Sequence, residues 1–300
     1  MTGSTSARTA AQRAIDNRPV DPRSVGPRIR MMMPDLSPME VRIVDYLMRT
    51  DFEESLPLKQ VADFSDVSEA MVVKTAKKLG FDGFRELRAA LFEYRRQPSV
   101  DLHEDVEPED TSEQIVRKVS RTAIQAIEET LAILDIKSFE RVANLIHVSK
   151  QRDFYGLGGS AQIARDVAHK FLRIGIRASV YDDSHMMAMS ANLLGPGDLV
   201  MAFSHSGRSS GLVEAVQFAK RNGASIVALS NYDTGPIADV ADVVLCSTAQ
   251  GSPLAGENAA ARIAQLTIMD AIFLAVAQRS YAAAERNLAR TMAAVQTKRK

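Results

Sequence analysis

Two short loops rich in serine and glycine carry the residues with the clearest chemical potential in this sequence. The first, Gly156–Ser160, reads Gly-Leu-Gly-Gly-Ser, follows an apolar segment and precedes a helical pattern. The second, Ser204–Gly211, reads Ser-His-Ser-Gly-Arg-Ser-Ser-Gly and has the same setting later in the chain. Glycine lets the backbone approach a ligand, helix N-termini attract anions, and serine hydroxyls add short neutral donors. The combination predicts a site for a phosphate monoester.

Other kinds of phosphate and metal chemistry are not supported by the residues present. The sequence contains no GxxxxGK[ST] pattern, so nucleoside triphosphate hydrolysis is not expected. The single cysteine, Cys246, excludes a disulfide framework and a cysteine zinc site, and we expect neither a metal nor a cofactor. Serines at helix starts can also act only as caps, but two such loops on neighbouring strands favour ligand binding.

The first loop also has a second interpretation, as part of a dinucleotide site. Gly156–Ala161 fits G-x-G-x-x-A, and Asp182 and Asp183 follow about 25 residues later, where a ribose-binding acid is expected. An NAD(H)-sensing repressor therefore stays an alternative. The second loop favours the phosphate site, because a dinucleotide fold does not require Ser-x-Ser-Gly-x-Ser after its third strand.

Both loops lie in a region where short apolar segments alternate with helical patterns. Such alternation predicts a doubly wound, flavodoxin-like parallel sheet with helices on both faces, and ligands bind at the carboxyl ends of its strands. Two helices are expected before the sheet, over 112–134 and 139–148. The expected strands are 153–157, 177–181, 199–204, 225–229 and 242–246, and the expected helices between and after them are 160–174, 185–194, 209–221 and 258–279.

The residues before this region form an all-helical pattern. Apolar spacing predicts helices over 37–49, after Pro57, over 69–79 and over 84–95. Ser68 is a suitable N-cap for the third helix, and Gly80 ends it. A short helix, a tight connection and a capped helix with cationic residues predict a helix-turn-helix, although a plain helical bundle would give the same pattern.

The second helix of such a motif enters the DNA major groove. The residues expected to face the bases are Ser68, Glu69, Ala70 and Met71. The residues expected near the phosphates are Lys74, Lys77 and Lys78. The chain as a whole has no net charge, but residues 74–96 contain seven basic and three acidic side chains, and residues 98–110 are acidic. This distribution is compatible with a DNA-binding surface followed by a linker.

The two loops and the helical segment before them resemble two known families. Ser204–Ser209, together with Gly158–Ser160, resembles the SIS (sugar isomerase) domain, and Val67–Phe84 resembles the helix-turn-helix of RpiR-type regulators. The resemblance runs from about residue 36 to 280. It implies a DNA-binding transcription regulator of carbohydrate metabolism genes, with a sugar phosphate as effector. The effector residues it implies are Gly158, Gly159, Ser160, Ser204, His205, Ser206, Gly207 and Ser209.

The sequence also departs from these families. RpiR-type recognition helices usually carry Thr, Arg and Phe where this chain has Met71, Lys74 and Thr75, so the operator sequence does not carry over. SIS isomerases need a carboxylate base, for which Glu257 is the candidate, but Glu257 also suits the first turn of a helix. We therefore expect a regulator without catalytic residues, with an isomerase bearing a DNA-binding appendage as an alternative.

The predicted partners are operator DNA, a sugar phosphate and a second copy in a homodimer or homotetramer, all in the cytoplasm. No membrane is expected, because the apolar runs are shorter than the roughly 18 residues of a spanning helix. The predicted divisions are a disordered arm or misplaced start over 1–35, a helix-turn-helix domain over 36–97, an acidic linker over 98–110, an α/β sugar-phosphate-binding domain over 111–281 and a C-terminal helix or tail over 282–300.

Overall fold

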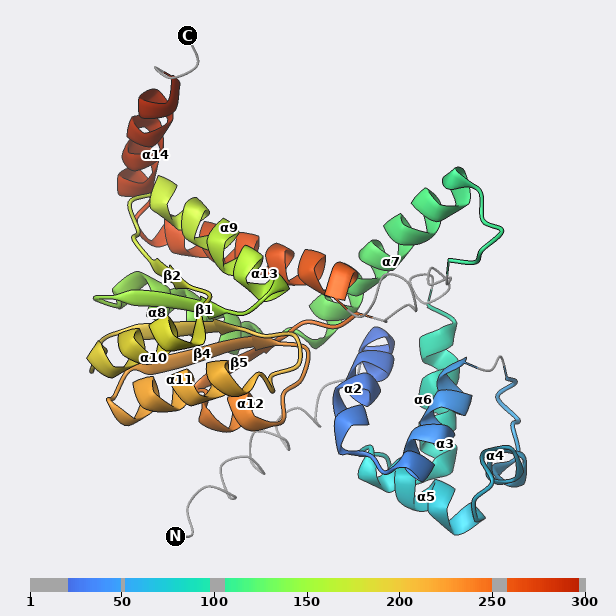
Figure 1. The fold of residues 1–300 in the computed structure, drawn as a ribbon. Helices are drawn as coiled ribbons and strands as arrows, with labels where there is room; N and C mark the ends of the chain where they lie inside the picture. The colour runs from blue at the N-terminus through green and yellow to red at the C-terminus, as the bar shows by residue number, and fades with distance from the viewer. Residues whose placement is uncertain (1–20, 50–51, 98–105, 250–257, 297–300) are drawn as a thin grey trace. The chain divides into compact units, whose positions relative to one another are not determined.

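The chain divides into two units, one entirely helical in its described residues and one built on a parallel sheet (Figure 1). The computed structural model describes residues 21–49, 52–97, 106–249 and 258–296. The first unit comprises residues 1–29 and 35–101, and the second comprises residues 30–34 and 102–300. This division confirms the predicted fold class, a helical N-terminal part followed by an α/β domain.

The first unit is held together by apolar residues at helical spacing. Ile43 and Leu47, four residues apart, are buried, as are Val61 and Val72 on the next two helices. The predicted helices are all found, with ends within about one residue of those expected. The helical elements before residue 98 are η1 (Pro22–Ser24), α2 (Val25–Met32), η2 (Met33–Asp35), α3 (Pro38–Arg49), α4 (Leu58–Ser65), α5 (Glu69–Lys78) and α6 (Phe84–Arg95), and residues 30–34 among them belong to the second unit.

Helix α2 corrects one prediction, the disordered arm over 1–35. Residues 22–35 are helical, and Val25 and Ile29 are buried on one face of α2. Gly26 lies so close to α6 that a Cβ on it would meet the Tyr94 ring at 2.2 Å. The prediction of a disordered arm was therefore wrong for residues 22–35. The helix was missed because its short apolar face is interrupted by Gly, Pro and Arg. Residues 1–20 lie outside the described part.

The second unit contains a five-stranded sheet in the order β2-β1-β3-β4-β5, in which all neighbouring strands are parallel. All five residues of the central strand β3 are buried, as expected for a strand covered on both faces. The strands are β1 (Arg152–Gly156), β2 (Ser179–Tyr181), β3 (Leu199–Phe203), β4 (Ser225–Ser230) and β5 (Val243–Cys246). This strand order is the flavodoxin-like one that the sequence predicts.

Helices cover both faces of this sheet, because successive strand residues point to opposite sides. Phe154 and Phe203 pack with α8, α9 and α13, whereas Tyr155 and Ala202 pack with α10, α11 and α12. Of these helices, α12 was not predicted. Their bounds are α8 (Ile136–Val148), α9 (Gly159–Arg173), α10 (Ser184–Leu193), α11 (Ser210–Arg221), α12 (Pro236–Val240) and α13 (Asn258–Arg279).

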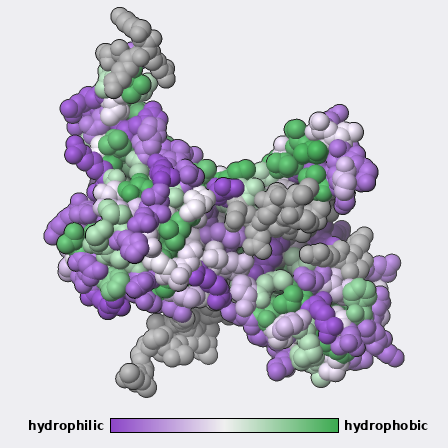
Figure 2. Space-filling view, in the orientation of Figure 1, coloured by the Kyte–Doolittle hydropathy of each residue, from purple (hydrophilic) through white to green (hydrophobic). Residues whose placement is uncertain are grey.

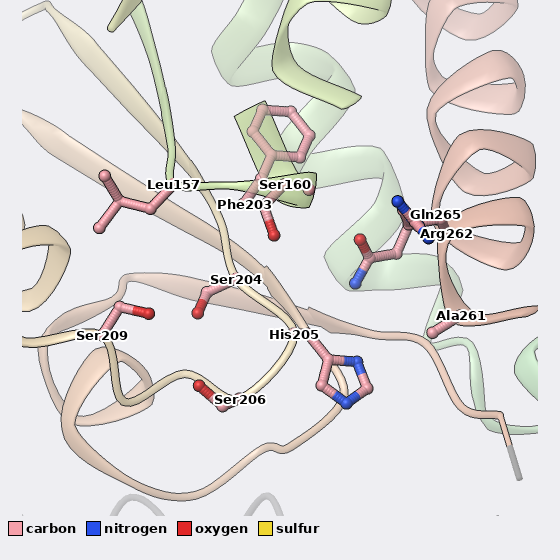
Figure 3. Close-up of a pocket in the computed structure, with 11 residues that line it drawn as sticks. Leu157, Ser160, Phe203, Ser204, His205, Ser206, Ser209, Ala261, Arg262 and Gln265 are labelled. Carbon is pink, nitrogen blue, oxygen red and sulfur yellow. The ribbon is translucent and has the colours of Figure 1, made fainter. Parts of the chain in front are cut away.

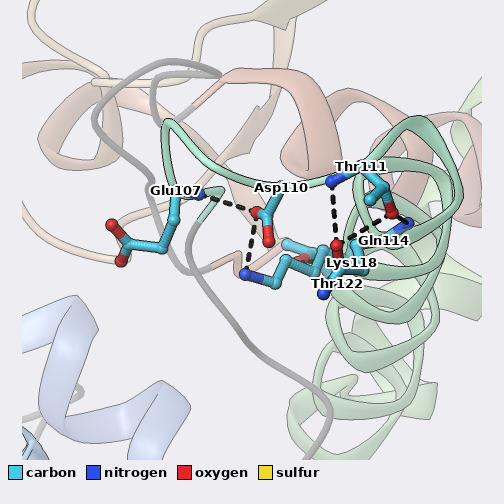
Figure 4. Close-up of polar contacts among 6 residues, drawn as sticks. All are labelled: Glu107, Asp110, Thr111, Gln114, Lys118 and Thr122. Atoms are coloured by element: carbon cyan, nitrogen blue, oxygen red, sulfur yellow. Dashed lines mark hydrogen bonds and ion pairs between the residues drawn. The ribbon is translucent and has the colours of Figure 1, made fainter.

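Helix α7 (Ser112–Ile133) begins with the predicted capping box. The Thr111 side chain accepts from the Gln114 backbone N–H, and the Gln114 side chain accepts from the Thr111 N–H (Figure 4). Just before it, Asp110 accepts from the Glu107 N–H at 2.7 Å and from Lys118 Nζ at 2.8 Å (Figure 4). Lys118 also holds the pKa of Asp110 below its usual value. The described end of the predicted linker is therefore fastened to α7.

Two helices complete the second unit. Helix α14 (Tyr281–Gln296) covers the end of α9, where Asn287 Nδ2 donates to the Ile174 carbonyl at 3.0 Å and Thr291 Oγ1 donates to the Arg173 carbonyl at 3.1 Å. Helix α13 is long and apolar enough to span a membrane by length and composition alone, contrary to the expectation of short apolar runs. It packs against α7, α8 and α9, so part of its apolar surface lies in the core of this unit.

Candidate functional site

The two serine-glycine loops meet at the point where the strand order reverses. Strands β1 and β3 are neighbours, and Gly156 pairs in register with Phe203, so the segments that follow both strands begin side by side. The helix after β1 is α9 and the helix after β3 is α11, which cover opposite faces of the sheet. Ligands of open α/β sheets bind at such a switch point.

The first loop turns sharply from β1 into α9. A Cβ on Gly156 would lie 2.8 Å from the Ser160 backbone, so only glycine allows this close approach. Gly158 has φ of +55° at the N-cap, where no side chain caps the helix. Ser160 lies in the first turn of α9. The N–H groups of that turn and the Ser160 hydroxyl are therefore placed to donate to an anion.

The second loop is held in shape by its own serines. Ser204 Oγ accepts from the Gly207 N–H at 3.0 Å, and Ser206 Oγ accepts from the Arg208 N–H at 3.2 Å. Gly207 has φ of +64°, a left-handed conformation that favours glycine. A serine oxygen that accepts one bond still has its own proton to donate. The loop therefore presents hydroxyl donors in fixed positions.

Ser209 does not cap the helix that it precedes. It occupies the N-cap of α11, but its side chain makes no capping hydrogen bond. By contrast, Asp183 at the N-cap of α10 accepts from the N–H groups of His185 and Met186, both at 3.0 Å. Ser209 is thus available to a ligand at the start of α11.

These loops line a pocket of about 240 Å³ (Figure 3). Six of the eight predicted effector residues lie on its wall, and the other two, Gly158 and Gly207, shape the loops behind it. His205 is half-buried and its ring meets that of Tyr232 edge-on, with 6.3 Å between centroids. The lining residues are Leu157, Gly159, Ser160, Phe203, Ser204, His205, Ser206, Ser209, Ala261, Arg262 and Gln265.

Helix α13 supplies pocket residues that were not predicted. Figure 3 shows Arg262 and Gln265 reaching in from α13, on the side away from Ser206 and Ser209. A Cβ on Gly159 would lie 3.3 Å from the Arg262 guanidinium, so this cation lies beside the start of α9. Their spacing of three residues in the first turns of a helix is the signal in the sequence, but the pairing of that helix with the loops is tertiary.

The acids that the dinucleotide interpretation needs have other roles here. Asp183 caps α10, and Asp182 forms an ion pair with Arg165 of α9. No Asp or Glu is among the described residues that line the pocket. The candidate base Glu257 lies outside the described residues. Within the described part of the chain, no cluster of three or more His, Cys, Asp or Glu side chains could hold a metal ion.

The predicted helix-turn-helix is formed by α4 and α5. Asp66 ends α4 in the left-handed conformation, with φ of 53°, and the Val67 N–H bonds back to the Ala62 carbonyl at 3.0 Å. Ser68 is the N-cap of α5, as predicted, and its hydroxyl accepts from the Met71 N–H at 3.3 Å. The two helices are joined by three residues, the length typical of this motif.

The residues predicted to contact DNA share the solvent face of α5, with two differences. Ser68, Glu69, Ala70, Lys74 and Lys77 are exposed, and Met71 is half-buried. Lys78 is exposed as well, but its Nζ donates to Glu40 Oε2 at 2.8 Å and to the Asp35 carbonyl at 2.9 Å. Its charge is therefore used within the unit. Thr75, one of the departures from the family pattern, is fully buried and belongs to the core.

Comparison with known proteins identifies both parts of the chain. The model of the family described as "Helix-turn-helix domain, rpiR family" matches residues 24–98, and that of the SIS domain matches residues 145–275. The HTH-type transcriptional regulator RpiR of Escherichia coli K12 is 42% identical over 91% of this chain and 94% of its own length. An uncharacterised HTH-type transcriptional regulator of Caldanaerobacter subterraneus is 32% identical over 84% of this chain and 90% of its own.

Solved structures support the same fold. The Vibrio vulnificus NanR protein complexed with ManNAc-6P aligns with a TM-score of 0.58 and 24% identity, covering 90% of this chain and 98% of that one. The sugar isomerase domain of the RpiR transcription factor from Sphaerobacter thermophilus aligns with a TM-score of 0.55 and 22% identity, covering 59% of this chain and 98% of that one.

The named curated relatives are transcriptional regulators and not enzymes.

Proposed function

Since this chain belongs to the RpiR family of HTH-type transcription regulators, we propose that a phosphorylated sugar bound in its SIS domain controls its binding to operator DNA. Its targets are genes of carbohydrate metabolism, and it acts on operator DNA in the cytoplasm. The observation that carries the proposal is the pocket at the β1–β3 switch point, where two helix N-termini and four serine hydroxyls converge.

The pocket suits the phosphate end of such a ligand. Ser204 and Ser206 accept backbone N–H bonds within their loop, which leaves their protons for phosphate oxygens. Ser209 makes no capping bond, and Ser160 lies in the first turn of α9. Arg262 adds a positive charge at the same wall. Neutral donors, helix dipoles and one guanidinium together match a phosphate dianion.

The DNA surface in this proposal is the exposed side of α5. Its N-terminal residues Ser68, Glu69, Ala70 and Met71 face the base edges. Lys74 and Lys77 contact phosphates, where their ammonium groups release counterions. Lys78 has a structural role instead, because Glu40 and the Asp35 carbonyl bind its ammonium group.

A homodimer is the assembly we propose, reading a two-fold symmetric operator. Hydrophobic residues gather on the N-terminal half of α7 (Figure 2), where Ile115, Val116 and Val119 are exposed. In α13, only 44% of the apolar window is buried, although a helix apolar on all sides is usually covered on all sides. A second copy of the chain would cover these helices.

The contacts around the pocket suggest how effector binding reaches the linker. Helix α13 carries Arg262 at the pocket and packs against α7. Thr130 of α7 accepts from the Thr248 N–H at 3.0 Å, just after β5. At its other end, α7 holds the linker through Asp110 and Lys118. A ligand that shifts α13 would therefore shift the population of linker arrangements that permit operator binding.

The test is operator binding with and without sugar phosphates, using a duplex selected by the protein from a random pool. At least one phosphorylated pentose or hexose should change the affinity of the wild type for this duplex. The double variant Ser204→Ala, Ser206→Ala should bind the duplex normally and lose the response.

The matched control is Ser179→Ala with Ser225→Ala, at the opposite, amino ends of β2 and β4. It should keep both DNA binding and the response. Loss of DNA binding in the Ser204/Ser206 double variant would mean that these serines are structural, and an unchanged response would rule out this pocket.

A further inference from the structure

Among the polar residues of the pocket, Gln265 and Ser204 are almost completely buried, with 2% and 3% of their surface exposed. Gln265 lies on α13 and reaches toward the loop that carries Ser204 and His205 (Figure 3). A buried amide has to satisfy two N–H donors and one carbonyl acceptor. Its hydrogen bonds therefore show which of these groups remains for a ligand.

The NH₂ group of Gln265 is held by two side chains that do not line the pocket. Gln265 Nε2 donates to Ser247 Oγ at 3.1 Å and to Asn231 Oδ1 at 3.4 Å. Ser247 Oγ in turn donates to Asn231 Oδ1 at 2.7 Å. The single proton of Ser247 goes to Asn231 Oδ1 or to the more distant Ser230 carbonyl at 3.5 Å, so Ser247 accepts from Gln265, which requires the NH₂ group to face it. Asn231 and Ser247 follow β4 and β5 directly.

The amide oxygen of Gln265 is thereby left for the pocket. In Figure 3 it points from α13 toward the side of the pocket that carries Ser160. The serine hydroxyls and the Arg262 guanidinium provide mainly donors, which a phosphate needs. A sugar hydroxyl differs from a fully ionised phosphate in that it also requires an acceptor for its proton.

We propose that Gln265 Oε1 accepts a hydrogen bond from a hydroxyl of the sugar, and that Ser247 and Asn231 are positioning residues that fix its orientation. This assignment rests on the proposed function and adds to it a residue that distinguishes a polyhydroxylated phosphate from phosphate alone. A buried acceptor left without its partner is costly, so the site selects for the hydroxyl as well as binding it.

The test compares inorganic phosphate with ribose 5-phosphate and fructose 6-phosphate, by calorimetric titration of the full chain. Gln265→Met keeps the side-chain length and removes the acceptor. It should lower the affinity for the sugar phosphate that the wild type binds by about tenfold. It should change the affinity for inorganic phosphate by less than about twofold. Equal losses for both, or no loss for the sugar phosphate, would overturn the assignment.

A second variant acts from outside the pocket. Ser247→Ala leaves Gln265 in place but frees its amide to rotate, and should lower the sugar phosphate affinity selectively by a smaller factor. Ser190→Ala is the matched control, since its buried hydroxyl bonds to Tyr155 and Asp153 away from the pocket. If Ser247→Ala left the ratio of sugar phosphate affinity to inorganic phosphate affinity unchanged, Ser247 would not be a positioning residue. If the wild type bound no sugar phosphate from a full panel of pentose and hexose phosphates, the proposed function itself would fail.

Discussion

Ser209 shows how a single residue can separate ligand binding from stability. A serine at an N-cap normally contributes about 1 kcal/mol through its capping bond. Ser209 makes no such bond, whereas Asp135 caps α8 by accepting from the Ser138 N–H at 2.9 Å. The two positions have the same place in a helix and different uses of the side chain.

We therefore expect Ser209→Ala to leave the unfolding free energy of the ligand-free protein within about 0.5 kcal/mol of the wild type. Its affinity for the effector should fall about tenfold, because a hydrogen bond to a charged phosphate is lost. Asp135→Ala should do the opposite, costing about 1 kcal/mol of stability at unchanged ligand affinity. Thermal unfolding and ligand titration of both variants would check this, and a destabilised Ser209→Ala would contradict it.

Glu40 makes the stability of the helical unit depend on pH. Its buried carboxylate accepts from Lys78 Nζ and from the Ser37 N–H, both at 2.8 Å, and these contacts lower its pKa to about 2. A carboxyl group with a lowered pKa in the folded state stabilises it above the unfolded pKa, and this contribution is lost as the pH falls. The window here runs from the ordinary value of 4.5 down to about 2.

Glu40→Gln should cost on the order of 1 kcal/mol at neutral pH and flatten the stability curve in that window. Hydrogen exchange of α3 and α5 amides, measured at several pH values, reports this unit separately from the sheet. Parallel curves for the variant and the wild type between pH 4.5 and 2 would show that Glu40 is not responsible.

At the scale of elements, the sequence predicted what depends on local pattern and missed what depends on tertiary contact. Helices α3 to α6 and the five strands follow from apolar spacing and from turn residues such as Gly80 and Gly158. Helix α2 was missed because its buried face consists of few residues, among them Val25 and Ile29. Arg262 was missed because α13 meets the two loops only in the folded sheet.

The turn between α4 and α5 illustrates the same limit. Asp66 has φ of 53°, and among the described residues it is the non-glycine residue with a positive φ. Nothing in its residue type required this conformation, although Asp tolerates it better than most. The turn depends on it, because the N–H groups of Asp66 and Val67 bond the last carbonyls of α4.

The effect of substituting Asp66 on stability should therefore depend more on the backbone freedom of the new residue than on its charge. We expect Asp66→Gly to keep or raise the stability of the helical unit, by up to about 1 kcal/mol, and Asp66→Val to lower it by about 1–2 kcal/mol. Hydrogen exchange in α4 and α5 measures both. If the valine variant were as stable as the glycine variant, the turn would not be strained.

For the whole molecule, the first question is which surface meets DNA. Lys77 and Lys78 are adjacent in sequence, but only Lys78 is held by Glu40 and the Asp35 carbonyl. Lys77→Ala should weaken binding to all duplexes and reduce the salt dependence by about one unit of slope per subunit. Lys78→Ala should leave the slope unchanged and lower stability. Filter binding at several salt concentrations compares the two variants. If the salt dependence of DNA affinity had the same slope for Lys77→Ala and the wild type, α5 would not lie in the DNA interface.

The second question is what the molecule senses, because one of the two loops alone would fit a dinucleotide as well as a sugar phosphate. The most direct measurement is thermal unfolding of the full chain against a panel of pentose and hexose phosphates, NAD and NADH. At least one sugar phosphate should raise the midpoint, the dinucleotides should not, and Ser204→Ala with Ser206→Ala should abolish the shift. Stabilisation by NADH and by no sugar phosphate would contradict the assignment of the pocket at β1 and β3.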